Sequence, residues 1–137
     1  MSLDATNSTD EVAEVLALKT WAVVGLSNNQ FRAAYSVAEL LQEKGHRIVP
    51  VHPSGETVHG EAGYKALSDI PFSIDVVDVF VNSYLAGAVI DEAISIGAKA
   101  VWLQLDVIDE AGIKRAKSAG LLTVMNRCPA IEYGKRG

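Results

Sequence analysis

The sequence predicts an α/β protein, with one doubly wound domain in which a five-stranded, mainly parallel sheet carries helices on both faces. Five short apolar runs, rich in β-branched residues, alternate with segments whose apolar residues recur at helical spacing. The chain has 137 residues, which is enough for one substantial core and too few for a cofactor domain followed by a substrate domain. A single domain is therefore expected.

The first half of the chain divides into a short N-terminal unit and the start of the sheet. Residues 1–19 are expected to form a polar lead and one helix, which begins at Ser8 or Thr9 and packs on the sheet edge. Residues 20–137 form the main domain. Gly45 is the kind of residue that follows a helix. The elements expected in this half are a helix at 8–18, a strand at 21–26, a helix at 32–44 and a strand at 47–51.

The second half repeats the alternation after a loop rich in proline and glycine. Gly97 and Gly120 follow helical patterns and mark their ends. The expected elements are a helical turn at 64–68, a strand at 75–81, a helix at 86–96, a strand at 100–105, a helix at 109–118 and a strand at 121–125. Because parallel strands bring their carboxyl ends to one edge, a ligand site is expected there.

Composition restricts the class of protein. The net charge of −5 argues against a general nucleic-acid or membrane-surface binder, but it allows one small anion held by a local cluster. No apolar run is long enough to span a bilayer, and the N-terminus is polar and acidic. With a single cysteine, Cys128, the sequence favours a reducing, cytoplasmic setting. No two of the three histidines have metal-ligand spacing, so no metal site is predicted.

The stretch after the first strand is the strongest candidate site. An apolar strand runs into Gly25, Ser27 and then Arg32 at a helix start, an arrangement that favours an anion beside unpaired helix N–H groups. A strand-turn-helix unit that holds no ligand is the alternative. The run lacks the three glycines of a dinucleotide fingerprint, and no acidic residue follows the second strand to hold an NAD ribose. Spacing alone predicts an anion site without naming its ligand.

Five stretches, in this order and spacing, resemble the small stand-alone CoA-binding proteins, which share a Rossmann-like domain with the N-terminal part of the succinyl-CoA synthetase α subunit. The resemblance covers residues 20–132. The matching stretches are AVVGLS at 22–27 with Arg32 and Tyr35 after it, IVPVHP at 48–53, VDVFVNS at 77–83, GAKAVWLQL at 97–105 and NRCPAIE at 126–132.

The resemblance implies a role for each matched position. It places the CoA phosphates on Gly25, Ser27 and Arg32, and the adenine between Val51 and Pro53. The further positions that it implies are Phe80, Asn82 and Ser83 along the groove, and Gln104, Cys128 and Pro129 along the pantetheine arm. The chain departs from the family pattern at 29–31, before the arginine, and at Asp106, where a glycine is expected.

Three functions remain open at this level. The first is a module that binds CoA or an acyl-CoA without chemistry of its own, with or without a protein partner or a second copy. The second is an enzyme that uses Cys128 on an acyl-CoA or a CoA disulfide, which requires an exposed sulfur with a base in reach; a buried Cys128 that ends the last strand is the alternative. The third is an NAD(P)-binding redox protein. His52 is expected to face solvent, and contact with a phosphate is the alternative.

Overall fold

A computed structural model of the chain, which describes residues 8–136, has one parallel sheet at its centre. The strand order is β2-β1-β3-β4-β5 and every neighbouring pair is parallel. The strands are β1 (Thr20–Val24), β2 (Arg47–Val51), β3 (Val76–Val79), β4 (Ala100–Leu103) and β5 (Leu122–Met125). The chain order switches direction between β1 and β3, so the predicted doubly wound α/β fold is confirmed.

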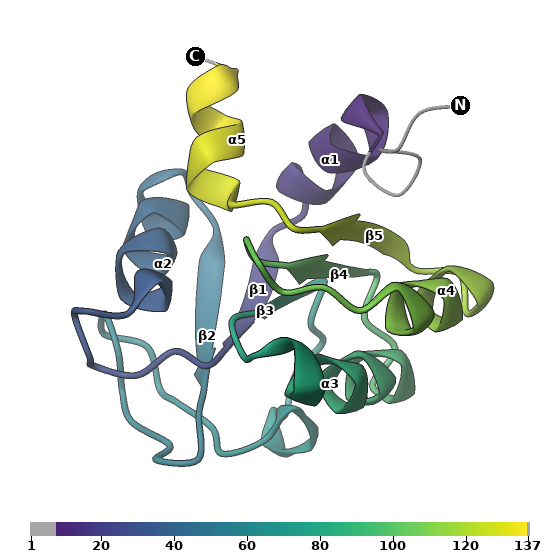
Figure 1. The fold of residues 1–137 in the computed structure, drawn as a ribbon. Helices are drawn as coiled ribbons and strands as arrows, with labels where there is room; N and C mark the ends of the chain where they lie inside the picture. Colours follow the sequence, from purple (N-terminus) through teal and green to yellow (C-terminus); the bar gives the residue numbers. More distant parts are fainter. Residues whose placement is uncertain (1–7, 137) are drawn as a thin grey trace.

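Helices cover both faces of this sheet (Figure 1). One face packs against α1 (Thr9–Leu16), α2 (Ala33–Glu43) and α5 (Pro129–Lys135), and the other against α3 (Ser83–Ser95) and α4 (Glu110–Ser118). Alternate strand residues point to opposite faces, which divides the buried side chains into two apolar clusters. Trp21 and Trp102 are fully buried in the cluster under α1, α2 and α5.

Helix α1 packs against β5, the edge strand, as expected. Val12, Val15 and Leu16 contribute its apolar face to the cluster that also holds Trp21. The Glu11 carboxylate accepts a hydrogen bond of 2.9 Å from the backbone N–H of Thr123 in β5. This contact satisfies a donor that an open sheet edge would leave unpaired.

Several element boundaries differ from the sequence prediction. The strand expected at 75–81 is β3, which spans only four residues, and the helical turn expected at 64–68 is a 3₁₀ turn at Leu67–Asp69. Helix α3 begins three residues earlier than expected, because Asn82 caps it by accepting a hydrogen bond of 3.1 Å from the N–H of Leu85. Helix α5 was not predicted at all, and Cys128 is its N-cap rather than the end of the last strand.

Candidate functional site

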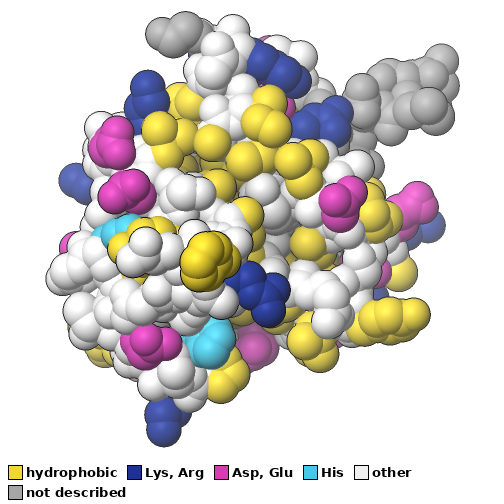
Figure 2. All heavy atoms as spheres, turned by 60° about the vertical axis from the view of Figure 1, so that its left-hand side comes forward, with side chains coloured by type: hydrophobic (Ala, Val, Ile, Leu, Met, Phe, Trp, Pro, Cys, Tyr) yellow, Lys and Arg dark blue, Asp and Glu magenta, His cyan; other side chains and the backbone are white. Residues whose placement is uncertain are grey.

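A pocket of about 780 Å³ opens at the carboxyl ends of β1 to β4, beside the point where the chain order switches direction. Figure 2 shows hydrophobic side chains coming to the surface on this side of the molecule, with a histidine and a Lys or Arg side chain near the middle of the view. The lining includes eight of the residues singled out from the sequence, namely Gly25, Ser27, Arg32, Val51, Pro53, Phe80, Asn82 and Gln104.

Gly25 sets the path of the chain out of β1. Its φ of +105° lies in the left-handed region that favours glycine, and its N–H donates to the carbonyl of Val51 at 2.8 Å. A Cβ at this position would lie 3.2 Å from the Cβ of Phe80. The close approach of β1 and β3 at this end of the sheet therefore depends on a residue without a side chain.

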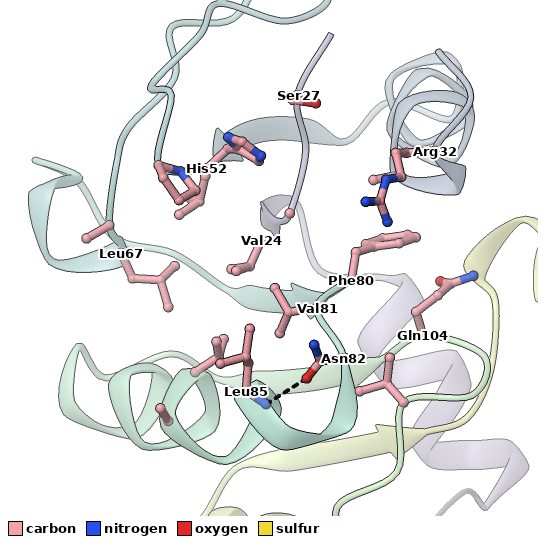
Figure 3. Close-up of a pocket in the computed structure, with 18 of the residues that line it drawn as sticks. Val24, Ser27, Arg32, His52, Leu67, Phe80, Val81, Asn82, Leu85 and Gln104 are labelled. Atoms are coloured by element: carbon pink, nitrogen blue, oxygen red, sulfur yellow. Dashed lines mark hydrogen bonds between the residues drawn. The ribbon is translucent and has the colours of Figure 1, made fainter. Parts of the chain in front are cut away.

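The loop from Leu26 to Arg32 forms one wall of the pocket. The hydroxyl of Ser27 accepts a hydrogen bond of 3.2 Å from the N–H of Asn29, which leaves the Ser27 O–H free to donate. Figure 3 shows the Arg32 guanidinium directed into the pocket beside the Phe80 ring. Arg32 forms no ion pair with any residue in 8–136. Its charge is therefore available to a ligand.

The start of α2 differs from the starts of the other long helices of the structure. No side chain in the described part of the chain caps it, whereas Ser8, Asn82 and Asp109 cap α1, α3 and α4. Ala33 and Ala34, its first two residues, line the pocket. The N–H groups of a helix's first turn have no partner inside the helix and carry partial positive charge. They therefore reinforce Arg32 as an anion site.

The opposite wall comes from the loop after β2 and a segment that pairs with it. Val51, His52 and Pro53 line the pocket, and the side chain of His52 is partly exposed there. Tyr64 pairs with the end of β2, because its carbonyl accepts from the N–H of His52 at 3.0 Å. This pairing brings Lys65, Ala66 and Leu67 into the lining.

The third side of the pocket is the end of β3 and the start of α3. Phe80, Val81 and Asn82 follow β3, and Leu85 and Val89 face them from α3. Because the Asn82 side-chain oxygen caps α3, its amide nitrogen remains as a donor. Figure 3 shows this nitrogen on the side away from the capped N–H. This side is mostly apolar.

Gln104 is the most deeply buried polar residue in the lining. It is 7 % exposed, and its side-chain oxygen has no hydrogen-bond partner among the described residues. Figure 3 shows its amide close to the Phe80 ring, on the Arg32 side of the pocket. A buried acceptor without a partner is costly. A ligand N–H would satisfy it.

Three of the residues implied by the resemblance lie outside the lining. The Ser83 hydroxyl accepts from the N–H of Ile108 at 3.0 Å and donates to the carbonyl of Asp106 at 3.4 Å, so it holds the loop after β4. Cys128 is buried under α5, at 7 % exposure, and Pro129 is the first residue of that helix. The structure separates this trio from the other eight residues.

Sequence reasoning missed much of the apolar lining and one cation. Leu67, Leu85 and Val89 carry no sequence signal that separates a pocket lining from an ordinary core. Lys65 stands in a segment with no strong pattern, and the alternation of strand and helix gives no sign that this segment pairs with β2.

The pocket carries both positive and negative side chains, and two of the positive ones belong to its lining. Arg32 and Lys65 line it, together with one carboxylate, Glu92. Glu56 lies beside the His52 loop, where hydrogen bonds from Asn28 and Ser54 lower the pKa of its carboxyl. The described residues include no group of three or more His, Cys, Asp or Glu that could hold a metal ion. No helix among them is long and apolar enough to cross a membrane.

Comparisons with known proteins agree with this architecture. The uncharacterized protein YneT of Bacillus subtilis is 31% identical over 124 residues, which cover 90% of this chain and 92% of that protein. A solved structure, a hypothetical protein from Pyrococcus horikoshii OT3, superposes with a TM-score of 0.90 at 37% identity and covers 98% of this chain and 96% of that one.

Larger proteins contain a similar region. The α subunit of an ADP-forming acetate–CoA ligase II from Pyrococcus furiosus is 31% identical over 81 residues, which cover 58% of this chain and only 18% of the subunit. A family described as a CoA binding domain matches residues 19–134, which include the whole sheet and every residue of the pocket lining. The chain therefore belongs to the CoA-binding domain family.

Proposed function

We propose that the protein binds coenzyme A in this pocket, with the diphosphate at the start of α2. The observation that carries the proposal is the uncapped α2 N-terminus, which meets the unpaired Arg32 inside a pocket of a CoA-binding family member. The free N–H groups and the guanidinium supply positive charge, and Ser27 supplies a hydroxyl donor. Because Gly25 has no side chain, the backbone lies close to Phe80 and the space between the loop and the start of α2 stays open for the diphosphate.

The opposite wall suits the adenine. Val51 and Leu67 are buried apolar residues, and the Pro53 ring is exposed in the lining beside them. A flat aromatic base can pack against such a surface, while the polar edge of the base remains in contact with water. The nucleotide would then lie across the pocket, from the Pro53 wall to the Arg32 wall.

The pantetheine arm would run toward Gln104. Its buried, unpartnered oxygen suits the amide N–H groups of the arm, and Phe80 and Val81 offer apolar contact along the way. Cys128 lies outside this path and is buried, which favours a module that holds or presents CoA over an enzyme that uses this cysteine. An acyl-CoA could enter in the same way. The single cysteine suits work in the reducing cytoplasm.

Calorimetric titrations with CoA, acetyl-CoA, NAD and ATP test the proposal. Saturable binding of CoA and acetyl-CoA, with NAD and ATP at least tenfold weaker, is the expected result. Binding of NAD in preference to CoA would contradict it and would favour the redox alternative. If acetyl-CoA is hydrolysed or transferred during the titration and Cys128→Ala abolishes that reaction, the protein is an enzyme.

Arg32→Met tests the position of the phosphates. The substitution removes the charge and keeps much of the side-chain length, so CoA affinity should fall by about tenfold to a hundredfold, the range for hydrogen bonds to charged groups. Pantetheine, which has no phosphate, should bind both forms equally. Arg115→Met is the matched control, because Arg115 lies on α4 and pairs with Asp91 on the surface. Equal losses for CoA and pantetheine would remove Arg32 from the phosphate site.

A further inference from the structure

The pocket continues past Gln104 onto a group of apolar side chains that meet solvent. Leu85 and Leu105 belong to the lining, and Ile108 lies on the same loop as Leu105. Their exposed fractions are 55 %, 43 % and 43 %. We propose that these three side chains form a subsite for an uncharged aliphatic acyl group, carried as a CoA thioester. The inference rests on the proposed binding of CoA and names the class of acyl group that the pocket takes.

Ser83 holds the two segments of this acyl subsite together. Its hydroxyl accepts a hydrogen bond of 3.0 Å from the N–H of Ile108 and donates to the carbonyl of Asp106 at 3.4 Å. Ser83 is the first residue of α3, two positions before Leu85. The loop after β4 therefore lies against the first turn of α3, and this arrangement brings the apolar residues of the loop beside Leu85.

The loop itself is a tight turn that carries a leucine at its corner. The N–H of Val107 donates to the carbonyl of Gln104 at 2.9 Å, and Asp106 has the positive φ that the third position of a type II turn requires. Leu105 takes the second position, although turns favour Gly, Pro, Asn, Asp and Ser. An isolated leucine on a surface needs no explanation, but this one adjoins two other exposed apolar side chains at the mouth of a pocket. A ligand that covers the group explains its exposure.

The position of Gln104 connects the acyl subsite to CoA. Its buried, unpartnered oxygen suits an amide N–H of the pantetheine arm. Figure 3 shows Asn82 between Gln104 and Leu85, so the end of the arm that carries the sulfur comes to the side chains beyond Gln104. The thiol of free CoA has too little apolar surface to cover them. An aliphatic acyl group on that sulfur would remove them from water, which is favourable.

The charge around the acyl subsite disfavours an acyl group that ends in a carboxylate. Residues 82–98 and 100–113, which build the subsite, contain no Lys or Arg. The Asp106 carboxylate lies on the same loop as Leu105 and forms no hydrogen bond or ion pair with any residue in 8–136. A second carboxylate beside it would be repelled, most strongly where the ligand displaces water. The subsite therefore selects a neutral chain over a dicarboxylic one of the same length.

Calorimetry with S-alkyl thioethers of CoA measures the subsite without hydrolysis of the ligand. S-ethyl-CoA, S-hexyl-CoA and S-carboxypentyl-CoA share the nucleotide and the pantetheine arm and differ only beyond the sulfur. Each additional methylene should tighten binding about twofold, which is half the free energy of full burial, because the subsite is open on one side. S-hexyl-CoA should therefore bind about fifteenfold more tightly than S-ethyl-CoA. S-carboxypentyl-CoA should bind no more tightly than S-ethyl-CoA.

Variants locate the effect. Leu105→Gln and Ile108→Gln should each reduce the preference for the hexyl over the ethyl thioether to about fourfold or less. Because this ratio compares two ligands on one variant, a general loss of stability does not change it. Asp106→Asn removes the charge and keeps a residue type that tolerates a positive φ, so S-carboxypentyl-CoA should gain severalfold relative to S-hexyl-CoA. Ile131→Gln is the control, because Ile131 is an isoleucine of α5 that is 50 % exposed, and it should keep the wild-type ratios.

The outcomes separate this inference from the function on which it rests. If the protein binds neither CoA nor its thioethers, the proposed function fails and the acyl subsite falls with it. If CoA binds and the ethyl and hexyl thioethers bind equally, the acyl subsite is refuted while CoA binding stands. If S-carboxypentyl-CoA binds as tightly as S-hexyl-CoA, the selection against charge is overturned. A dimer in analytical ultracentrifugation that Ile108→Gln dissociates, with no effect of chain length on binding, would show that a second copy covers these side chains instead.

Discussion

Gly25→Ala should destabilise the fold and weaken ligand binding together. Alanine at a φ of +105° adopts a backbone conformation that costs about 1–3 kcal/mol. The new Cβ would also meet the Phe80 Cβ at 3.2 Å and the Phe80 carbonyl oxygen at 3.4 Å. Both atoms belong to the residue directly after β3, whose N–H donates to the Val24 carbonyl at 2.9 Å, so either the loop or the strand end must shift. We expect the free energy of unfolding to fall by about 2–4 kcal/mol.

Two other glycines separate the causes of that loss. Gly97 has a φ of +76°, and Gly134 lies within helix α5. At either position an added Cβ would meet no atom of the described residues within 4 Å. Gly97→Ala should therefore report the backbone cost alone, and Gly134→Ala should be neutral or slightly stabilising. Urea unfolding gives the stabilities and calorimetry gives the CoA affinity, which should fall at least tenfold only for Gly25→Ala. If Gly25→Ala matches Gly134→Ala in both measurements, neither the fold nor the binding of CoA depends on the missing side chain at position 25.

Two further predictions concern Asp78, a buried carboxyl group, and Asp106, a residue with a positive φ, both outside the pocket lining. Burial without a hydrogen-bond partner raises the pKa of the Asp78 carboxyl well above its ordinary value. The pKa of an aspartate in the unfolded chain is about 3.9. Above that pH the unfolded state loses its proton while the folded state keeps it, so the free energy of unfolding of the wild type should fall relative to that of Asp78→Asn, by up to about 1.4 kcal/mol per pH unit until the folded group ionises. Urea unfolding at pH 4.5 and at pH 7.5 that gave the same difference between the two proteins would contradict this. Asp106 has a φ of +68°, and its side chain forms no hydrogen bond or ion pair with any residue in 8–136. Asp106→Gly should therefore leave the free energy of unfolding unchanged or raise it by at most about 1 kcal/mol, and should not lower the melting temperature. Asn126→Ala, which removes an acceptor for the Asp106 N–H and keeps a Cβ at a φ of +61°, should lower it; a loss of stability in Asp106→Gly would show that the carboxylate contributes a contact.

The sheet was predictable because its strands are buried on both faces. Such strands are nearly continuous apolar runs, as at Trp21–Val24 and Ala100–Leu103, and need no alternation to be recognised. Helix α5 lacks the usual pattern. It has seven residues, includes Gly134, exposes Ile131 and buries Glu132. Periodicity therefore could not find it, and the packing of its residues over the sheet decides its structure.

The pocket was predictable where it follows a strand directly. Gly25, Asn82 and Gln104 all come at strand ends, where a parallel sheet places its ligands. Lys65 reaches the pocket only because Tyr64 pairs with β2, a long-range contact that no local pattern encodes. At Asp106, by contrast, the structure explains an expectation drawn from the sequence. The family resemblance led us to expect glycine there, and the positive φ supplies the reason.

The claim that the CoA phosphates lie at the start of α2 can be checked with backbone amide chemical shifts of ¹⁵N-labelled protein titrated with CoA. We expect the largest shift changes at Gly25, Ser27, Ala33 and Ala34. Pantetheine should leave the shifts of these four amides unchanged and should change the shift of the Gln104 amide. Amides of α1 and α5 should stay unchanged. Shifts that cluster on α4, with those of Ala33 and Ala34 unmoved at saturation, would contradict the claim.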